Sequence, residues 1–210
     1  MAELGSDLLR LAQVMVRLRA ECPWDAEQTH LSLATFLVEE TGEVLDAIEA
    51  GDDTDLAEEL GDLLLQVYFH AEIARREGRF DIDDVASGIA DKLIRRHPYV
   101  FGDSDVPDDL NATWEARKRE EKGRTSSLVG IAEHLSAIAR GVKVVTRTRH
   151  HNVAIDLPSE PITEDEVGRG IVDLIARAQA SGVDADQATR LAIRELEARV
   201  RDAEARTGQA

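Results

Sequence analysis

Apolar side chains recur at intervals of three and four residues through nearly the whole 210-residue chain, and this is the period of a helix with one buried face. Near the amino end, Leu8, Leu11, Met15 and Leu18 share one face of a predicted helix. Proline is scarce, with 5 residues in the chain, so few positions interrupt a helix. We find no convincing strand, and the pattern therefore predicts an all-α fold.

Glycine, proline and capping residues divide this pattern into separate helices. Gly51 and Gly78 each follow a periodic run, where glycine commonly ends a helix. Asp55 and Glu58 have the spacing of a capping box, which would open the helix after Gly51. Pro98 excludes the helical conformation from the residue before it. We expect helices over roughly 6–20, 31–50, 55–76 and 83–97, then a loop and a short fifth helix that ends near residue 123.

Four acidic residues stand where these helices should be apolar. On the second predicted helix, Glu40 lies at the centre of the apolar stripe and Glu43 at its edge. The third predicted helix is apolar almost all round except for one strip, which carries Glu59 and Asp62. A short turn at Gly51 makes the two helices antiparallel neighbours. Two pairs of carboxylates are therefore expected to face each other.

This arrangement of carboxylates indicates a bound cation. A single acidic residue on a helix is ordinarily a solvated surface residue, but four that face each other repel one another and lose hydration. A cation between the helices would offset that cost. The set offers only oxygen ligands, with neither a cysteine nor a Glu-x-x-His pair. This favours Mg²⁺ or Mn²⁺ over zinc or a ferritin-like di-iron centre.

The net charge of the chain limits its partners. The 42 acidic and 25 basic residues give a formal charge of −17, which would repel nucleic-acid backbones and anionic membranes. A small anionic substrate is still compatible, because a bound divalent cation reverses the sign of an acidic site. The single cysteine, Cys22, is what a reducing cytosol permits. With no apolar run near the roughly 20 residues of a membrane span and no export signal, we expect a cytoplasmic protein.

Four motifs follow one another along the first part of the chain. They are Cys22-Pro23-Trp24-Asp25 with Gln28-Thr29, the run from Leu37 to Ile48, the run from Glu59 to Leu64, and the run from Lys92 to Phe101. In order and in spacing, over roughly residues 7–122, they resemble the MazG nucleoside triphosphate pyrophosphohydrolases. We therefore interpret residues 1–123 as a MazG-like catalytic helical domain.

The resemblance implies a fold, a reaction and a set of site residues. The fold is an antiparallel helix bundle that assembles as a homodimer. The reaction is the Mg²⁺-dependent hydrolysis of nucleoside triphosphates to a monophosphate and pyrophosphate, and Mn²⁺ can replace Mg²⁺. Its role is to remove unwanted nucleotides from the nucleotide pool. The implied metal ligands are Glu40, Glu43, Glu59 and Asp62, with Glu58 beside the substrate. The implied substrate contacts are Lys92 and Arg96 for the triphosphate and Trp114 and Lys118 for the nucleotide.

Several points stay open at the level of sequence. Glu39 and Glu58 are both candidates to accept the proton of the attacking water, and the sequence does not choose between them. Base preference is not readable, because stacking on Trp114 tolerates any base. Two alternatives compete with the main hypothesis: a narrow pyrophosphatase for dCTP or dUTP, and a non-catalytic protein that uses its acidic helices as an interaction surface.

Three ring side chains receive structural interpretations. We predict that Trp24 anchors its loop as a core residue. His70, which shares the acidic strip of the third predicted helix, is expected to be a satisfied core histidine. His97 is expected to cap the carboxyl end of the fourth helix.

Residues 124–210 are interpreted as a shortened, inactive copy of the same module. Glu166-Val167-Gly168 matches Glu59-Leu60-Gly61, and Arg169 then stands where Asp62 stands in the first copy. Farther on, residues 192–199 resemble residues 89–96, with Glu195 in the place of Lys92. Both substitutions reverse a charge. We find no second Glu-x-x-Glu helix between 124 and 161, and we therefore expect one active site per chain.

Overall fold

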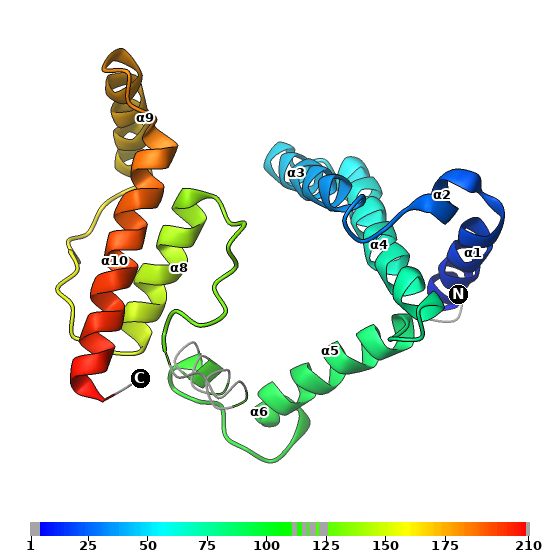
Figure 1. The fold of residues 1–210 in the computed structure, drawn as a ribbon. Helices are drawn as coiled ribbons and strands as arrows, with labels where there is room; N and C mark the ends of the chain where they lie inside the picture. Colours follow the sequence, from blue (N-terminus) through cyan, green and yellow to red (C-terminus); the bar gives the residue numbers. More distant parts are fainter. Residues whose placement is uncertain (1–4, 111–112, 115–116, 118–120, 122–125, 209–210) are drawn as a thin grey trace. The chain divides into compact units, whose positions relative to one another are not determined.

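The chain is all-helical in a computed structural model, which describes residues 5–110, 113–114, 117, 121 and 126–208 (Figure 1). Along the described residues the helices include α1 (Ser6–Glu21), α2 (Pro23–Glu27), α3 (Ala34–Ala50), α4 (Asp53–Arg76), α5 (Ile82–Arg96), α6 (Pro98–Phe101), α8 (Ala137–His150), α9 (Glu164–Ala180) and α10 (Ala185–Thr207). The described residues contain no strand, which confirms the predicted all-α fold. None of the helices searched in this part of the chain is both long and apolar enough to cross a membrane.

The chain divides into two compact units, residues 1–104 and residues 105–210. We call them unit 1 and unit 2. The boundary that we predicted between a catalytic and an inactive module, at 123/124, lies outside the described residues, and it stays a prediction. Unit 1 holds all four predicted metal ligands, and unit 2 holds the proposed second copy of the module.

The core of unit 1 forms where α1, the start of α3 and the second half of α4 meet. Met15 of α1 and Leu33, which directly precedes α3, are both almost fully buried. They pack with Tyr68, Phe69 and Ile73 of α4. These residues occupy the apolar faces that the helical period predicts. The core therefore fixes the carboxyl-terminal half of α4, while the acidic side chains lie nearer its start.

Local capping moves two helix starts away from the predicted positions. α3 begins at Ala34 rather than near Leu31, because the side chains of Thr29 and Ser32 bond each other's backbone N–H groups, at 3.1 and 2.9 Å, and hold a turn there. α4 begins at Asp53 with Asp52 as its cap, so the capping box predicted at Asp55 is wrong. Two consecutive aspartates precede Asp55, and the first of them takes the capping position.

Unit 2 is organised around α8 and α10, which pack side by side (Figure 1). Ala137 and Val144 of α8 pack with Ile193 of α10. Val153, which follows α8, packs with Val200 farther along α10. The later residue on one side of this contact meets the later residue on the other side, so α8 and α10 run in the same direction. Among the described helices, α9 packs mainly against α10.

Candidate metal centre

α3 and α4 form an antiparallel hairpin that positions the site (Figure 1). Gly51 reverses the chain with a φ of 69°, which glycine adopts without strain, and its N–H donates to the Ala47 carbonyl at 3.1 Å. Asp52 then caps α4, accepting from the N–H groups of Thr54 at 2.8 Å and Asp55 at 3.2 Å. This short connection keeps the two helices packed together, so that acidic residues of α3 face those of α4.

Three of the predicted ligands meet at this interface. Carboxylate oxygens of Glu40 and Glu43 on α3 and of Glu59 on α4 lie within 4.8 Å of one another. Glu40 and Glu59 are half-buried, and Glu43 is exposed. Asp62, one turn after Glu59 and also half-buried, lies close enough for its charge to act on both Glu40 and Glu59. The structure therefore brings the four predicted carboxylates into one cluster.

Mutual repulsion marks the electrostatics of this cluster. Burial raises the pKa of Glu40, and the charges of Asp62, Glu43 and Glu59 raise it further. The pKa of Glu59 is raised in the same way, by burial and then by its acidic neighbours Glu43 and Asp62. A divalent cation among the oxygens would offset both effects, because its positive charge stabilises the ionised carboxylates. The donor set, carboxylate oxygen only, fits a hard ion such as Mg²⁺ or Mn²⁺.

The two candidates for a general base differ in their surroundings. Glu58 precedes Glu59 on α4, and its charge is among the causes that raise the pKa of Glu59. Glu39 is not among the charges that shift either Glu40 or Glu59. Both side chains are exposed. Glu58 thus lies electrostatically close to the cluster.

Lys92 and Arg96 lie one turn apart on α5, which follows α4 after the turn at Gly78. Lys92 is half-buried and Arg96 is buried. Among the described residues, α5 packs against α4 and α6 but has no extensive contact with α3. Neither cation is among the charges that shift the pKa of Glu40 or Glu59. Within one chain, α5 therefore does not pack extensively on α3, which carries Glu40 and Glu43.

The remaining predicted substrate residues fall in unit 2. Trp114 is helical and half-buried. Lys118 lies outside the described residues, so the pairing of these two side chains on one helix face stays a prediction.

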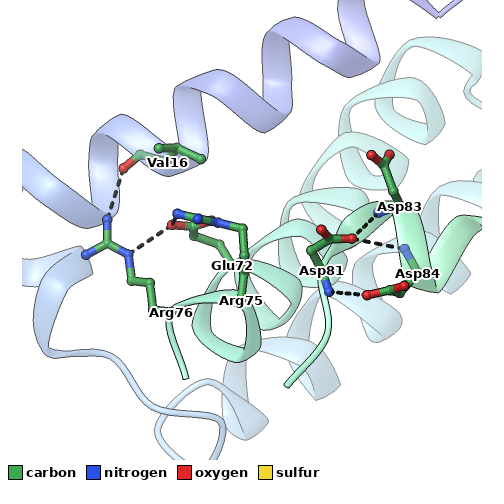
Figure 2. A network of polar contacts seen from close by, with 7 residues as sticks. All are labelled: Val16, Glu72, Arg75, Arg76, Asp81, Asp83 and Asp84. Carbon is green, nitrogen blue, oxygen red and sulfur yellow. Dashed lines mark hydrogen bonds and ion pairs between the residues drawn. The ribbon is translucent and has the colours of Figure 1, made fainter. Parts of the chain in front are cut away.

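A buried acidic residue connects α4 to α1 at the far end of the hairpin (Figure 2). The carboxylate of Glu72 accepts from Arg75 at 2.6 and 2.9 Å and from Arg76 at 2.9 Å. Arg76 also donates to the Val16 carbonyl of α1 at 3.1 Å. The hydrogen bonds from Arg75 are the largest cause of the lowered pKa of Glu72. These contacts hold α1 on the carboxyl end of α4 and leave the acidic end unconstrained by them.

The start of α5 is fixed beside this network. Asp81 accepts from the N–H groups of Asp83 at 2.9 Å and Asp84 at 3.0 Å, and Asp84 returns a bond to the Asp81 N–H at 3.0 Å (Figure 2). This is a capping box in which an aspartate takes the usual glutamate position. It sets the direction in which α5 leaves the turn after α4, and therefore where Lys92 and Arg96 lie.

A histidine pair is a feature that sequence reasoning missed. His30, which precedes α3, and His70 of α4 place their Nδ1 atoms 2.7 Å apart with the rings nearly parallel. Arg79 donates to Nε2 of His30, so the His30 proton lies on Nδ1 and is donated to His70. His70 therefore has a hydrogen-bond partner, as predicted, but it is half-buried and not a core residue. Helical periodicity gave no signal for its partner, because His30 lies in a turn between helices.

Two other ring side chains have contrasting outcomes. His97 follows α5, and its Nδ1 lies 2.7 Å from the Leu93 carbonyl, so its predicted capping role is confirmed. The prediction that Trp24 is a core residue is wrong, because 53% of it is exposed. Its ring meets Phe36 and Phe69 edge-on, with centroids 6.0 and 6.4 Å away. It stabilises the α2 loop from outside the core.

Comparison with known proteins identifies what this chain is similar to. Residues 28–101 match the family model described as the MazG nucleotide pyrophosphohydrolase domain. That range contains the four carboxylates together with Lys92 and Arg96 of α5, and it ends before Trp114 and Lys118.

Relatives match over much more of the chain. A nucleoside triphosphate pyrophosphohydrolase of Escherichia coli is 43% identical over 83% of this chain and 69% of its own length. A protein of Mycobacterium tuberculosis with the same name is 38% identical over 97% of this chain and 60% of its own. An uncharacterized 26.1 kDa protein of Streptomyces cacaoi is 43% identical over 95% of this chain and 84% of its own. A crystal structure of a mazG-related protein from Thermotoga maritima aligns with 53% of this chain and 98% of its own, at 27% identity and a TM-score of 0.47.

Proposed function

The chain belongs to the MazG family of nucleotide pyrophosphohydrolases, and we propose that it hydrolyses nucleoside triphosphates to a monophosphate and pyrophosphate at the α3–α4 carboxylate cluster. Its activity is that of a nucleoside triphosphate pyrophosphohydrolase, like that of the relatives from Escherichia coli and Mycobacterium tuberculosis that carry this name. The finer proposal is that Mg²⁺, or Mn²⁺ in its place, is held by Glu40, Glu43, Glu59 and Asp62. We further propose a role in clearing the nucleotide pool of the cytoplasm.

The observation that carries this proposal is the convergence of carboxylates from two helices. Exposed acidic residues are common, but these approach within 4.8 Å and two of them are half-buried. The raised pKa values of Glu40 and Glu59 express the cost of that arrangement. A protein that only used these helices for packing would gain nothing from it. A divalent ion bound here would neutralise phosphate charge and lower the pKa of a bound water.

The chain's own residues then divide the remaining work. Glu58 is the carboxylate that we propose to accept the proton of the attacking water, because its charge acts on Glu59. Replacing Glu58 by Gln should lower kcat by about 10²-fold or more and flatten the acidic limb of the pH profile. Glu39→Gln is the matched control on α3. The opposite ranking of the two variants would transfer the role to Glu39.

We propose that a second copy of the chain takes part when Lys92 and Arg96 bind the triphosphate. Within one chain α5 has no extensive packing on α3, and both helices expose large apolar side chains, among them Val38 at 74%, Ile48 at 55% and Ile94 at 47%. We therefore propose a homodimer in which α5 of one protomer lies against the carboxylate cluster of its partner. Burial of these side chains would supply the association energy.

Mixing inactive variants tests this arrangement directly. Asp62→Ala lacks a proposed metal ligand and Lys92→Ala lacks a proposed phosphate contact, so each homodimer should be inactive. After unfolding and refolding together, heterodimers would contain one site with both residues intact, and up to about a quarter of wild-type activity per chain should return. Failure of the mixture to recover activity, with the dimer verified by light scattering, would place both residues in one chain's site.

The reaction itself is tested by its products. Incubation with a nucleoside triphosphate and Mg²⁺ should release one pyrophosphate and one nucleoside monophosphate per turnover, because the bond that breaks joins the α and β phosphates. Release of orthophosphate would contradict the proposal. A panel of canonical deoxynucleotides, including dCTP and dUTP, and damaged triphosphates would separate a broad enzyme from a narrow one. Chelation by EDTA should abolish turnover, and added Mg²⁺ or Mn²⁺ should restore it.

A further inference from the structure

Unit 2 contains a cavity of about 410 Å³ between α8, α10 and the segment that precedes α8. Four of the side chains that line it are basic or can become so. They are His134 before α8, Arg140 on α8, and Arg190 and Arg194 on α10. Such a concentration of basic groups contrasts with a chain whose formal charge is −17.

One wall of this cavity is built and rigid. Arg140 of α8 contacts the buried carboxylate of Glu197 on α10 through Nε and Nη2, both at 2.7 Å. Its Nη1 donates to the Ala132 carbonyl at 3.1 Å. The contact neutralises Glu197 and attaches the segment before α8 to the helix pair. A charged residue held on three sides in this way keeps its position when a ligand enters.

Two further arginines line the cavity from α10. Arg190 forms an ion pair with Asp186 one turn earlier on α10. Arg194 lies one turn later on the same face, and no hydrogen bond or ion pair is recorded for it in the part of the chain that the structure describes. With Glu197 already paired to Arg140, Glu133 is the one remaining acidic side chain that lines the cavity.

We propose that this cavity binds a small molecule that carries a phosphate group. Guanidinium groups match phosphate oxygens with two parallel hydrogen bonds, and the volume lies within the range of small-molecule sites. Leu135 and Ala137 supply an apolar part of the lining, which suits the ring of a nucleotide better than a bare ion. The site lies in unit 2, so it goes beyond the proposed catalytic function of unit 1 and does not depend on it.

Metal-free binding measurements separate this site from the carboxylate cluster. Isothermal titration of the full chain with AMP, and separately with inorganic pyrophosphate, would be done in EDTA so that the proposed metal site takes no part. Arg194→Gln removes the arginine that has no recorded partner. Arg177→Gln on α9 is the matched control, because it changes the net charge equally, pairs only with Asp173 in the recorded contacts, and lies outside the cavity. Lys92→Gln tests whether unit 1 accounts for the binding.

We expect wild-type chain and Arg177→Gln to bind AMP equally well, and Arg194→Gln to bind it at least about tenfold more weakly. Tighter binding of AMP than of pyrophosphate would assign the apolar lining to a nucleoside, and the reverse order would assign the site to inorganic phosphates. Three results would overturn the proposal: no binding by wild-type chain at millimolar ligand, equal weakening by Arg194→Gln and Arg177→Gln, or loss of binding in Lys92→Gln. Circular dichroism would verify that each variant is folded.

Discussion

Charged residues face each other across a helix pair in both units, but with different partners. In unit 1, Glu40 of α3 meets Glu59 of α4, and every recorded charge that shifts these two groups is another carboxylate. In unit 2, Glu197 of α10 is paired with Arg140 of α8 at 2.7 Å. In unit 2 the negative charge of Glu197 is therefore neutralised by an arginine of the same chain. The cluster of unit 1 has an excess of carboxylates, which is the charge pattern that favours a bound cation.

The turns between helices are alike even though the charges differ. α4 is followed by Gly78 and α5 is capped by Asp81, while α9 is followed by Gly182 and α10 is capped by Asp184. Both glycines have positive φ, at 67° and 69°. The proposed copy relation pairs the same helices, α4 with α9 and α5 with α10. Under it Arg169 replaces Asp62, and Arg169 pairs with Asp165 on its own helix at 2.8 Å.

The largest predicted effect separates the two units by activity. Asp62→Ala should lower turnover by more than about 10²-fold, because changes to groups that only support metal ligands already cost 10- to 100-fold. Arg169→Ala, at the matching position of unit 2, should leave turnover unchanged. Steady-state pyrophosphate release measures both. A substantial loss in Arg169→Ala would show that unit 2 contributes to catalysis and would contradict one active site per chain.

Metal should stabilise unit 1 in a pH-dependent manner. The raised pKa values of Glu40 and Glu59 mean that the folded state binds protons more tightly than the unfolded chain. Their contribution to stability is therefore present at acidic pH and is lost as the pH rises from about 4.5 through the raised values. Added Mg²⁺ should raise Tm more at pH 8 than at pH 5, because the carboxylates are ionised at pH 8.

The two tryptophans allow that prediction to be measured unit by unit. Trp24 reports on unit 1 and Trp114 on unit 2. In a Trp114→Phe chain, melting followed by Trp24 fluorescence should shift with Mg²⁺, and the shift should disappear in Asp62→Ala. If Mg²⁺ shifted the melting temperature reported by Trp114 in a Trp24→Phe chain by the same amount, the metal would not be stabilising unit 1 specifically.

Two buried carboxylates compare the packing of the units. Glu72 accepts from two arginines, whereas Glu204 accepts from the Ser126 hydroxyl at 2.6 Å and the Ser127 N–H at 2.8 Å. Glu72→Gln should cost about 2 kcal/mol and Glu204→Gln about 1 kcal/mol, since hydrogen bonds between charged groups are the stronger ones. Urea unfolding of each variant at pH 7 measures both values. The reverse order would show that unit 2 depends more on its buried acid than unit 1.

The same two residues predict how stability changes in acid. The pKa of Glu72 is lowered, mainly by hydrogen bonds from Arg75. Burial would raise the pKa of Glu204, but its bonds from Ser126 and Ser127 leave it lowered overall. Each group therefore adds stability above about pH 4.5, and this is lost as the pH falls through the lowered value. In each Gln variant the urea midpoint should depend less on pH between 5 and 3 than in the wild-type chain.

The sequence predicted what depends on periodicity and spacing. The helical class and the meeting of Glu40 and Glu43 with Glu59 follow from residues three and four apart and from a short turn at Gly51. The sequence predicted helix starts less well, because several neighbouring side chains can act as the cap. The start of α4 was misplaced because three aspartates between 52 and 55 can each cap a helix.

Contacts between distant segments were beyond reach of the same reasoning. His30 lies in a turn, where no period relates it to His70 of α4. The exposure of Trp24 depends on how the α2 loop lies against Phe36 and Phe69, which single-sequence patterns do not encode. The direction of α5 relative to the cluster depends on the turn after α4 and on the capping box at Asp81. Each of these is a tertiary property set by packing.

The smallest expected effect concerns the histidine pair of unit 1. Burial lowers the pKa of His70, and the neighbouring His30 lowers it further, so the folded state disfavours the proton that the unfolded chain accepts near pH 6.5. Stability is therefore full above about pH 6.5 and falls as the pH drops through the lowered value. In the Trp114→Phe chain, urea unfolding followed by Trp24 fluorescence should give a midpoint that falls between pH 7.5 and 5.5. His70→Gln should flatten this dependence, whereas His150→Gln, at an exposed position of unit 2, should leave it unchanged. If both variants keep the wild-type slope, protonation of the pair is not what weakens unit 1 in mild acid.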